Sequence, residues 1–287
     1  MENEQYYLDR IQELEKQVTQ KDEFIYLIVH DLKTPLAVIA SALQTLDLVC
    51  KHEMPDKAKK FLNTIKQNIN RQIRLVNNLL DITRLHAGHI KLSNRNCDIV
   101  STTQYIVNSV QTYAQQKNIT LKFKAMFPSK TTFIDEEKYE RSLLNLLSNA
   151  IKFTPSGKSI NVSITTKIHK QAELLSVSIK DEGIGIPKDK QSIIFERFGQ
   201  SDTELSRHAE GTGLGLHLVK LFVNALGGEI NLKSEEGKGS NFILYLPLVQ
   251  SDVPDEITEY HQMRNQPFNH NNRILEAAAI EFSDTHY

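Results

Sequence analysis

The sequence predicts an α+β protein in which a long helical hairpin precedes a separate α/β sandwich. Apolar residues recur at intervals of three and four residues between Ile11 and Ile82, which is the period of an amphipathic helix. After residue 90, short segments that alternate in polarity are interleaved with shorter helical patterns. The chain has 287 residues, which is enough for two domains if a domain takes ~150 residues.

The N-terminal helix carries a heptad pattern typical of a left-handed coiled coil. Its a and d positions are Ile11, Leu14, Val18, Lys21, Ile25, Ile28 and Leu32. The segment KHEMPDK interrupts the pattern, and Pro55 suits the first turn of a second helix over residues 56–86, with Gly88 as its stop. An antiparallel hairpin of this kind cannot bury its apolar faces alone, so we expect two copies to form a dimeric four-helix bundle.

The region after residue 90 mixes strands and helices without strict alternation. This favours helices packed on one face of a mixed sheet. Asp135 is a good N-cap for the longest helix of the region. The expected strands are 90–94, 119–123, 159–168, 174–183, 229–235 and 240–247, and the expected helices are 99–116, 136–153 and 214–226.

These patterns divide the chain into four segments. Residues 1–20 are expected to form a coiled-coil helix, 21–88 a dimerisation domain, 89–250 the sandwich and 251–287 a polar tail. The tail contains one apolar stretch, ILEAAAIEF, which is a candidate docking element.

Composition excludes several classes of function. The net charge is −1, from 34 basic and 35 acidic residues, so nothing indicates a nucleic-acid partner. Cys50 and Cys97 form no disulfide framework and no metal-ligand pattern, and a reducing cytoplasm suits two bystander thiols. Because no uninterrupted apolar run approaches ~18 residues and the first residues are polar, we expect a cytoplasmic chain without a membrane span or signal peptide.

His30 is the first candidate for chemistry. The heptad register puts it at an f position, which points away from a bundle axis. An exposed imidazole titrates near neutral pH and can act as a nucleophile, which the neighbouring Asp31 could orient or deprotonate. Thr34 lies one turn later on the same face. Taken alone, His30 is more simply interpreted as one of ten histidines, on the surface.

A second candidate site combines Asn145, Asn149 and Lys152. Spacings of four and three residues put all three on one helix face. Amide oxygens suit Mg²⁺, and a lysine supplies a point charge for phosphate. A solvated polar face explains the same pattern equally well.

Two glycine-rich stretches follow. Asp181 ends a strand and precedes Gly183 and Gly185, so a carboxylate could accept a hydrogen bond from an amino group where the backbone can approach a ligand closely. The same stretch could be a simple turn. A second stretch opens a helix, whose N-terminal amides favour phosphate, and has glycines at Gly211, Gly213 and Gly215. The charged segment between the two stretches has the length of a mobile lid.

Five motifs in this order resemble those of bacterial sensor histidine protein kinases of two-component systems. HDLKTPL (30–36) resembles their phosphoacceptor box and NLLSNAIKFTPSG (145–157) their asparagine box. DEGIGIP (181–187) and EGTGLGL (210–216) resemble the two glycine boxes, and IFERFGQ (194–200) the phenylalanine box. The resemblance covers about residues 20–248, and the amino-acid sequence as a whole is similar to those of clostridial kinases linked to PAS sensors.

The resemblance implies a fold, a reaction and roles. Residues 21–88 would be a dimerisation and histidine phosphotransfer domain, and 89–250 an ATP-binding domain of the histidine kinase/Hsp90-like type. His30 would be phosphorylated from ATP with Asp31 as general base, and Asn149 would hold Mg²⁺. Asn145 would assist at the phosphates, Lys152 would contact phosphate and Phe153 would stack on adenine. Asp181 would bind the adenine amino group, with Gly183 and Gly185 shaping that pocket. Gly211, Gly213 and Gly215 would place amides near phosphate and let the lid close, with Phe195 and Phe198 anchoring the lid.

The resemblance also implies partners. These are a second copy of the chain, the receiver domain of a response regulator that takes the phosphoryl group on aspartate, and an upstream sensor partner. Thr34 would aim water at the phosphorylated regulator, or would only satisfy a carbonyl beside Pro35. Gln200 departs from the family, which often has arginine there, and Arg207 is a candidate substitute.

Other protein families with the same ATP-binding fold suggest alternative functions. Gyrase-, Hsp90- and MutL-like ATPases carry glutamate where this chain has Asn145, and an amide cannot activate water as a carboxylate can. Anti-sigma-factor serine kinases lack a hairpin with HDLKTP. A further alternative is a dimeric scaffold without kinase activity. A phosphorylation assay would distinguish this alternative from a kinase.

Overall fold

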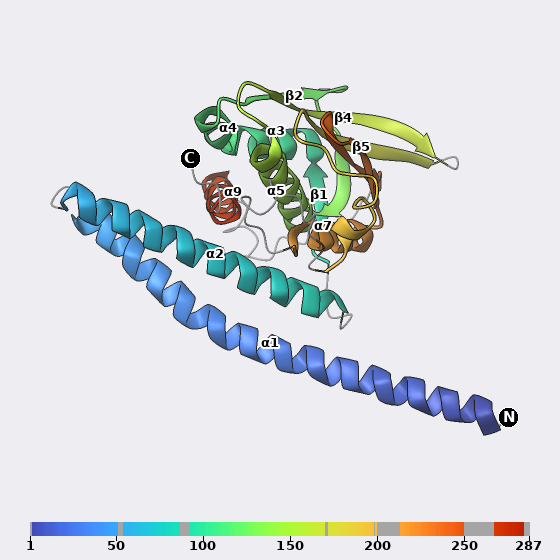
Figure 1. The fold of residues 1–287 in the computed structure, drawn as a ribbon. Helices are drawn as coiled ribbons and strands as arrows, with labels where there is room; N and C mark the ends of the chain where they lie inside the picture. The colour runs from blue at the N-terminus through green and yellow to red at the C-terminus, as the bar shows by residue number, and fades with distance from the viewer. Residues whose placement is uncertain are drawn as a thin grey trace. The chain divides into compact units, whose positions relative to one another are not determined.

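A computed structural model describes residues 2–50, 54–86, 92–169, 172–197, 199, 213–249 and 267–283. The chain divides into two compact units, Met1–Lys91 and Leu92–Tyr287. The first is the expected helical hairpin and the second the expected α/β sandwich, so the predicted α+β class is confirmed (Figure 1).

The first unit consists of two helices, α1 (Glu2–Cys50) and α2 (Asp56–His86). Pro35 lies inside α1, and α2 has the bounds that the sequence predicts. The two helices pack through a small apolar cluster of Val29, Val76 and Leu80, with Ile25, Leu36 and Leu79 against it. Lys66 Nζ on α2 also lies 2.6 Å from Asp47 Oδ2 on α1.

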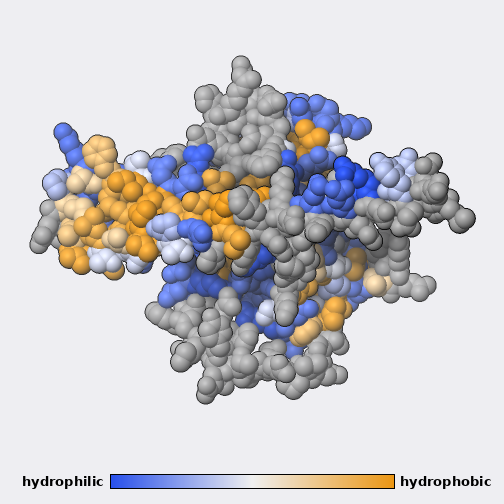
Figure 2. All heavy atoms as spheres, turned by 90° about the horizontal axis from the view of Figure 1, so that it is seen from below, coloured by the Kyte–Doolittle hydropathy of each residue, from blue (hydrophilic) through white to orange (hydrophobic). Residues whose placement is uncertain are grey.

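A second apolar stripe of α1 is left exposed. Ile28 and Leu32 of the predicted seam are 44% and 51% exposed, and the same seven-residue period continues to Ile39, Leu46 and Val49, which are also exposed. Figure 2 shows apolar side chains gathered over the arm that the hairpin forms. The seam residues from Ile11 to Lys21 lie outside the described side chains. One hairpin therefore covers only one of the two apolar stripes of α1.

One stretch of α1, Leu27–Cys50, is long and apolar enough to cross a bilayer if only length and composition are considered. The sequence expectation concerned an uninterrupted apolar run, so this finding does not contradict it, and the absence of a membrane span stays a prediction. A search for an uninterrupted run misses it because Asp31, Lys33 and Asp47 interrupt the stretch. Helices of soluble proteins can pass the same test, so it is weak evidence for a span.

A five-stranded mixed sheet forms one layer of the second unit, in the order β2-β4-β5-β7-β6. β2 and β4 are parallel, and the other neighbours are antiparallel. The expected strands 229–235 and 240–247 form a hairpin that turns at Glu236 and Gly237, since β6 pairs with β7 from Glu229↔Tyr245 to Glu235↔Gly239. The strands are β2 (Thr120–Ala125), β4 (Ser159–His169), β5 (Ala172–Asp181), β6 (Glu229–Glu235) and β7 (Gly239–Pro247).

A two-stranded antiparallel sheet lies beside it, formed by β1 (Asn94–Asp98) and β3 (Thr131–Asp135). The sequence predicts no strand at β3, and it predicts the first strand at 90–94, of which the described part is coil before Asn94. The strand begins later because residues 94–98 are the ones that pair with β3. It ends at Asp98, whose side chain caps the next helix by accepting from the Val100 amide.

Helices cover one face of the five-stranded sheet (Figure 1). The predicted helix 99–116 is two helices, α3 (Ile99–Ser109) and α4 (Gln111–Gln116), separated at Val110. α5 (Glu136–Phe153) starts after Asp135, whose side chain accepts from the Lys138 amide as predicted. α7 (Gly215–Ala225) and α9 (Pro267–Glu281) complete the described helices, with a 3₁₀ turn η1 (Ile193–Phe195) before α7. The core between the layers contains buried Tyr139, Leu143, Leu147, Ile160, Val177 and Phe222.

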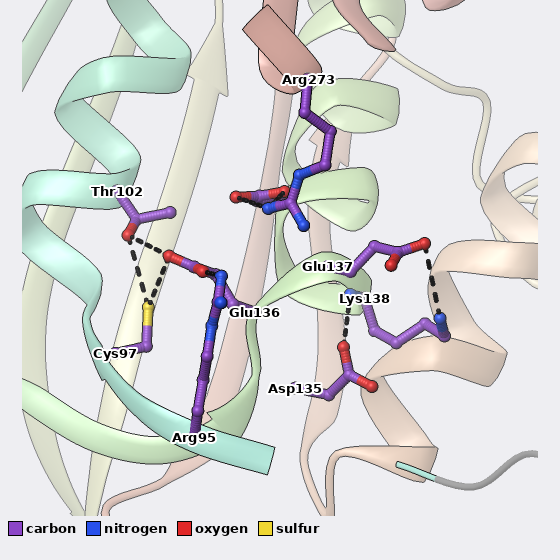
Figure 3. A network of polar contacts seen from close by, with 9 residues as sticks. Arg95, Cys97, Thr102, Asp135, Glu136, Glu137, Lys138 and Arg273 are labelled. Carbon is purple, nitrogen blue, oxygen red and sulfur yellow. Dashed lines mark hydrogen bonds and ion pairs between the residues drawn. The ribbon is translucent and has the colours of Figure 1, made fainter. Parts of the chain in front are cut away.

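A buried polar network joins β1, α3 and α5 (Figure 3). Glu136 pairs with Arg95 and accepts hydrogen bonds from Thr102 Oγ1 at 3.0 Å and Cys97 Sγ at 3.4 Å. Burial raises the pKa of the Cys97 thiol to about 11. A protonated, buried thiol is unreactive, which agrees with the expected bystander role of Cys97.

Candidate active site

Asp181 lies buried at the end of β5, with 5% of its surface exposed. Its Oδ1 accepts hydrogen bonds from the Gly183 amide at 2.8 Å and the Ser240 amide at 3.2 Å. Burial raises the pKa of this carboxyl, and the two amides oppose the shift. Since both bonds go to Oδ1, Oδ2 is the oxygen that can accept from a ligand amino group.

Gly183 and Gly185 let the loop after β5 pack tightly. A Cβ at Gly183 would lie 2.6 Å from Asp181 Oδ1 and 2.7 Å from the Phe153 carbonyl oxygen. Gly185 has φ +69°, and a Cβ there would collide with the Glu235 carbonyl. The structure shows close approach of the chain to itself at both glycines, and the close approach to a ligand that the sequence suggests stays a prediction. Both glycines therefore shape the wall around Asp181.

The C-terminal end of α5 meets this loop. The Ile184 amide donates to the Phe153 carbonyl at 3.3 Å, which joins the asparagine-rich helix to the Asp181 loop. Lys152 Nζ lies 5.6 Å from the centre of the Phe153 ring. Lys117 Nζ donates to the carbonyls of Ile151 and Lys152 at 2.9 and 2.6 Å, which satisfies the helix end. The hydrogen bond between Ile184 and Phe153 therefore joins the segment that carries Lys152 and Phe153 to the loop that carries the buried Asp181 carboxylate.

Asn145 and Asn149 contact each other on α5, as their spacing predicts. Asn149 Nδ2 donates to Asn145 Oδ1 at 3.4 Å. Asn145 is buried, with 6% of its surface exposed, and Asn149 is half-buried. The burial of Asn145 does not fit the alternative of a solvated polar face. Because Asn149 uses its NH₂ group in this bond, its Oδ1 is the end that can bind a cation.

The second glycine-rich stretch lies against Asn145. Gly215 begins α7, and a Cβ at this position would lie 2.6 Å from Asn145 Oδ1 and 2.8 Å from Nδ2. Gly213 adopts φ +67°, a conformation that favours glycine. Gly211 lies outside the described residues. The structure therefore brings together Asn145 and Gly215, which are far apart in the sequence.

Sequence reasoning missed one residue of this site, Glu281. Its Oε1 accepts a hydrogen bond from Asn145 Nδ2 at 3.1 Å. Glu281 ends α9, inside the range that was expected to be a tail. The signal that could have found the helix is the spacing of Ile274, Ala278 and Phe282 at four-residue intervals, which is one helix face.

The segment between the glycine motifs is described only in part. Phe195 packs against the core and makes an edge contact with Phe242, with ring centres 6.2 Å apart. His217 Nδ1 on α7 lies 2.9 Å from the Phe195 carbonyl. Phe198, Gln200 and Arg207 lie outside the described residues. Phe195 therefore has the contacts of an anchor at the start of this segment.

His30, Asp31 and Thr34 lie on α1, in the other unit. Asp31 and Thr34 are exposed, and the side chain of His30 lies outside the described residues. Its predicted f position therefore stays a prediction.

The donor set fits Mg²⁺ bound with a nucleotide. Among the described residues, no group of three or more His, Cys, Asp or Glu side chains could hold a metal by itself. Asn149 offers one amide oxygen, and Mg²⁺ commonly takes one or two protein oxygens together with water and phosphate oxygens. A cation here would thus depend on a phosphate ligand.

Two family descriptions match this chain. Residues 20–88 match the His Kinase A (phospho-acceptor) domain, and residues 134–250 match the histidine kinase-, DNA gyrase B-, and HSP90-like ATPase family. The first match contains the hairpin with His30, and the second contains Asn145, Asp181 and Gly215. α9 lies beyond the second match.

Curated relatives match most of the chain. Sensor histidine kinase TmoS of Ectopseudomonas mendocina is 37% identical over 241 residues, which are 84% of this chain and 24% of that protein. Sensor histidine kinase WalK of Bacillus subtilis (strain 168) is 34% identical over 247 residues, which are 85% of this chain and 39% of that protein. The chain thus spans well under half the length of either relative.

Two solved structures share the fold. The crystal structure of full-length ShkA in complex with AMPPNP matches with a TM-score of 0.65 and 25% identity, over 81% of this chain and 47% of that one. The histidine kinase AdeS of Acinetobacter baumannii matches with a TM-score of 0.53 and 20% identity, over 77% of this chain and 98% of that one. The second likeness concerns the fold alone.

Proposed function

The chain belongs to the sensor histidine kinases of two-component systems, and on that premise we propose that it phosphorylates its own His30 from ATP. The phosphoryl group then passes to an aspartate in the receiver domain of a response regulator. The observation that carries the proposal is the contact between Asn145 and Gly215, because it joins the asparagine and second glycine motifs around a single buried amide.

The residues of the second unit would bind and orient ATP. Oδ2 of Asp181 accepts from the adenine amino group, and Phe153 stacks on the ring. Asn149 supplies an amide oxygen to Mg²⁺, Lys152 supplies positive charge, and Asn145 assists at the phosphates. Amides at the start of α7 meet phosphate, with Gly211, Gly213 and Gly215 allowing the chain to close there. Bound Mg²⁺ neutralises the charge that develops on the phosphates.

Phosphoryl transfer would take place on His30. An imidazole nitrogen attacks the γ-phosphorus while the bond from that phosphorus to the β–γ bridging oxygen breaks, so ADP leaves. The attacking nitrogen is the unprotonated one, and as it bonds to phosphorus the proton on the other ring nitrogen passes to Asp31, which is exposed one residue later. The phosphohistidine then donates the group to the regulator. Thr34, which is exposed one helical turn later, would aim water at the phosphoaspartate of the regulator, and hydrolysis would release inorganic phosphate.

The hairpin would form a homodimer. The exposed stripe of Ile28, Leu32, Ile39, Leu46 and Val49 keeps the heptad period, so a second copy of the chain is the partner whose geometry it fits. The same pairing accounts for the apolar composition of Leu27–Cys50 without a bilayer. We therefore propose a cytoplasmic kinase core, and we propose an upstream sensor partner as the source of its signal.

The test is autophosphorylation with γ-labelled ATP and Mg²⁺. We expect an acid-labile, base-stable label that His30→Ala abolishes while ATP binding stays. His217→Ala is a poor control because this histidine contacts Phe195, so His86→Ala, at the end of α2, serves as the matched variant. A label that persists in His30→Ala would refute the assignment of the phosphoacceptor. ATP binding without any label would favour a scaffold.

A further inference from the structure

The C-terminal helix α9 is part of the core of the nucleotide-binding unit. Ile274, Ala278 and Phe282 are each at most 2% exposed, and Phe282 stacks on Tyr113 with ring centres 4.6 Å apart. Figure 1 shows α9 beside α5, the helix that carries the two asparagines. Burying three apolar side chains on one face fixes this helix against α5 and α3.

An ion pair fixes α9 along α5. Arg273 donates to both oxygens of Glu140 at 2.8 and 2.7 Å, and Figure 3 shows Arg273 extending from its helix toward α5. Burial raises the pKa of Glu140 to about 7, and the guanidinium opposes the shift. Because one nitrogen, Nη2, bridges both carboxylate oxygens, this charge-assisted contact holds Arg273 against Glu140 and so positions α9 along α5.

The last residue of α9 then meets Asn145. Glu281 Oε1 accepts from Asn145 Nδ2 at 3.1 Å, and the Glu281 carbonyl lies 3.4 Å from Ser148 Oγ, which donates to it. A hydrogen bond to a carboxylate is stronger than one between neutral groups. The Glu281 carboxylate therefore favours the orientation of the Asn145 amide in which the NH₂ group points toward α9.

The orientation of the Asn145 amide in turn determines the orientation of the Asn149 amide. With its NH₂ group turned to Glu281, Asn145 presents Oδ1 to Asn149 Nδ2, and Asn149 in turn has Oδ1 left for a cation. Gly215 lies against the same Asn145 amide and limits its movement. A reversed Asn149 amide would point NH₂ at the metal, which cannot bind it.

We propose that Glu281 is a positioning residue for the Mg²⁺ site, acting through Asn145 to orient the metal-binding oxygen of Asn149. The inference rests on the proposed function, because it takes Asn149 as the Mg²⁺ ligand. It extends the site beyond residues 134–250, to a helix that the family match does not cover. Groups that orient metal ligands typically contribute about 10–100-fold to metal affinity or activity.

The test compares three variants of the full chain. Glu281→Ala removes the acceptor, Glu281→Gln keeps an acceptor oxygen without the charge, and Glu276→Gln changes an exposed carboxylate on the same helix. ATP affinity is measured by titration calorimetry with Mg²⁺ and with EDTA, and thermal unfolding is followed in parallel. We expect Glu281→Ala to weaken ATP binding about tenfold or more with Mg²⁺ and to leave it unchanged in EDTA. Glu281→Gln should recover part of the loss, and Glu276→Gln should match the wild type.

Two outcomes would overturn the proposal. One is an ATP affinity of Glu281→Ala that equals that of the wild type both with Mg²⁺ and in EDTA. The other is an equal loss with and without Mg²⁺, since that would show that Glu281 only supports the fold. Labelling of His30 is measured separately. A wild type that binds ATP with Mg²⁺ dependence but takes no label would overturn the proposed kinase reaction alone.

Discussion

Gly215 lies so close to Asn145 that a Cβ on Gly215 would be 2.6 Å from Asn145 Oδ1. A Cβ carbon essentially never lies within 3.0 Å of an atom outside its own and the two adjacent residues, so the absence of a side chain at position 215 is required for the present position of the Asn145 amide. This contact links the start of α7 to the amide pair on α5.

Gly215→Ala should therefore displace the Asn145 amide and weaken binding of ATP with Mg²⁺ by about tenfold, which is ~1.4 kcal/mol. Gly157→Ala is the control, because Gly157 has φ +81° but no atom within 4 Å of its Cβ position. It should cost stability through backbone strain and leave ATP affinity unchanged. Titration calorimetry and thermal unfolding separate the two effects. Equal ATP affinities for Gly215→Ala and the wild type would show that Asn145 takes no part in binding.

Asp181→Asn should weaken ATP binding by about tenfold or more, since loss of a buried charge-assisted hydrogen bond costs ~1.5–3 kcal/mol. The new amide can keep its oxygen toward the Gly183 and Ser240 amides, which leaves NH₂ facing the adenine amino group. Glu182→Gln is the matched control, because Glu182 is exposed and bonds Ser159 instead. If Asp181→Asn bound ATP as the wild type does, another group would recognise the base.

Leu46→Glu should shift the protein from dimer to monomer at micromolar concentration, because it puts a charge into the exposed heptad stripe of α1. Leu48→Glu is the control. Leu48 is more exposed, at 79% against 42% for Leu46, but lies off the stripe. Sedimentation velocity measures both. Dissociation by the two variants alike would argue against the stripe, and a monomeric wild type would refute the four-helix bundle.

Thr34→Ala should keep autophosphorylation and phosphotransfer but slow dephosphorylation of the regulator, if Thr34 positions water. The control is Thr45→Ala, since Thr45 is an exposed threonine of the same helix that bonds the Ser41 carbonyl. The measurement is the decay of purified phospho-regulator with each variant and ADP. Decay at the wild-type rate in Thr34→Ala would leave Thr34 with only a structural role beside Pro35.

The sequence alone determined the elements that depend on local patterns. α2 spans Asp56–His86 as its periodicity predicts, and Asp135 caps α5 because one side chain and the third amide after it suffice for that bond. The pairing of Asn145 with Asn149 follows from the helical repeat in the same way. Each of these features involves residues no more than one turn apart or one repeating period.

Only the tertiary structure decided the features that join distant parts of the chain. β3 is a short strand without clear alternation, and it forms because β1 pairs with it from Asn94↔Asp135 to Asp98↔Thr131. Gly215 meets Asn145, and Glu281 reaches Asn145 from α9, because the apolar face of α9 is buried on α5. No local signal encodes such contacts. They arise when burial of apolar area brings together helices far apart in sequence, and the polar side chains at their ends then meet.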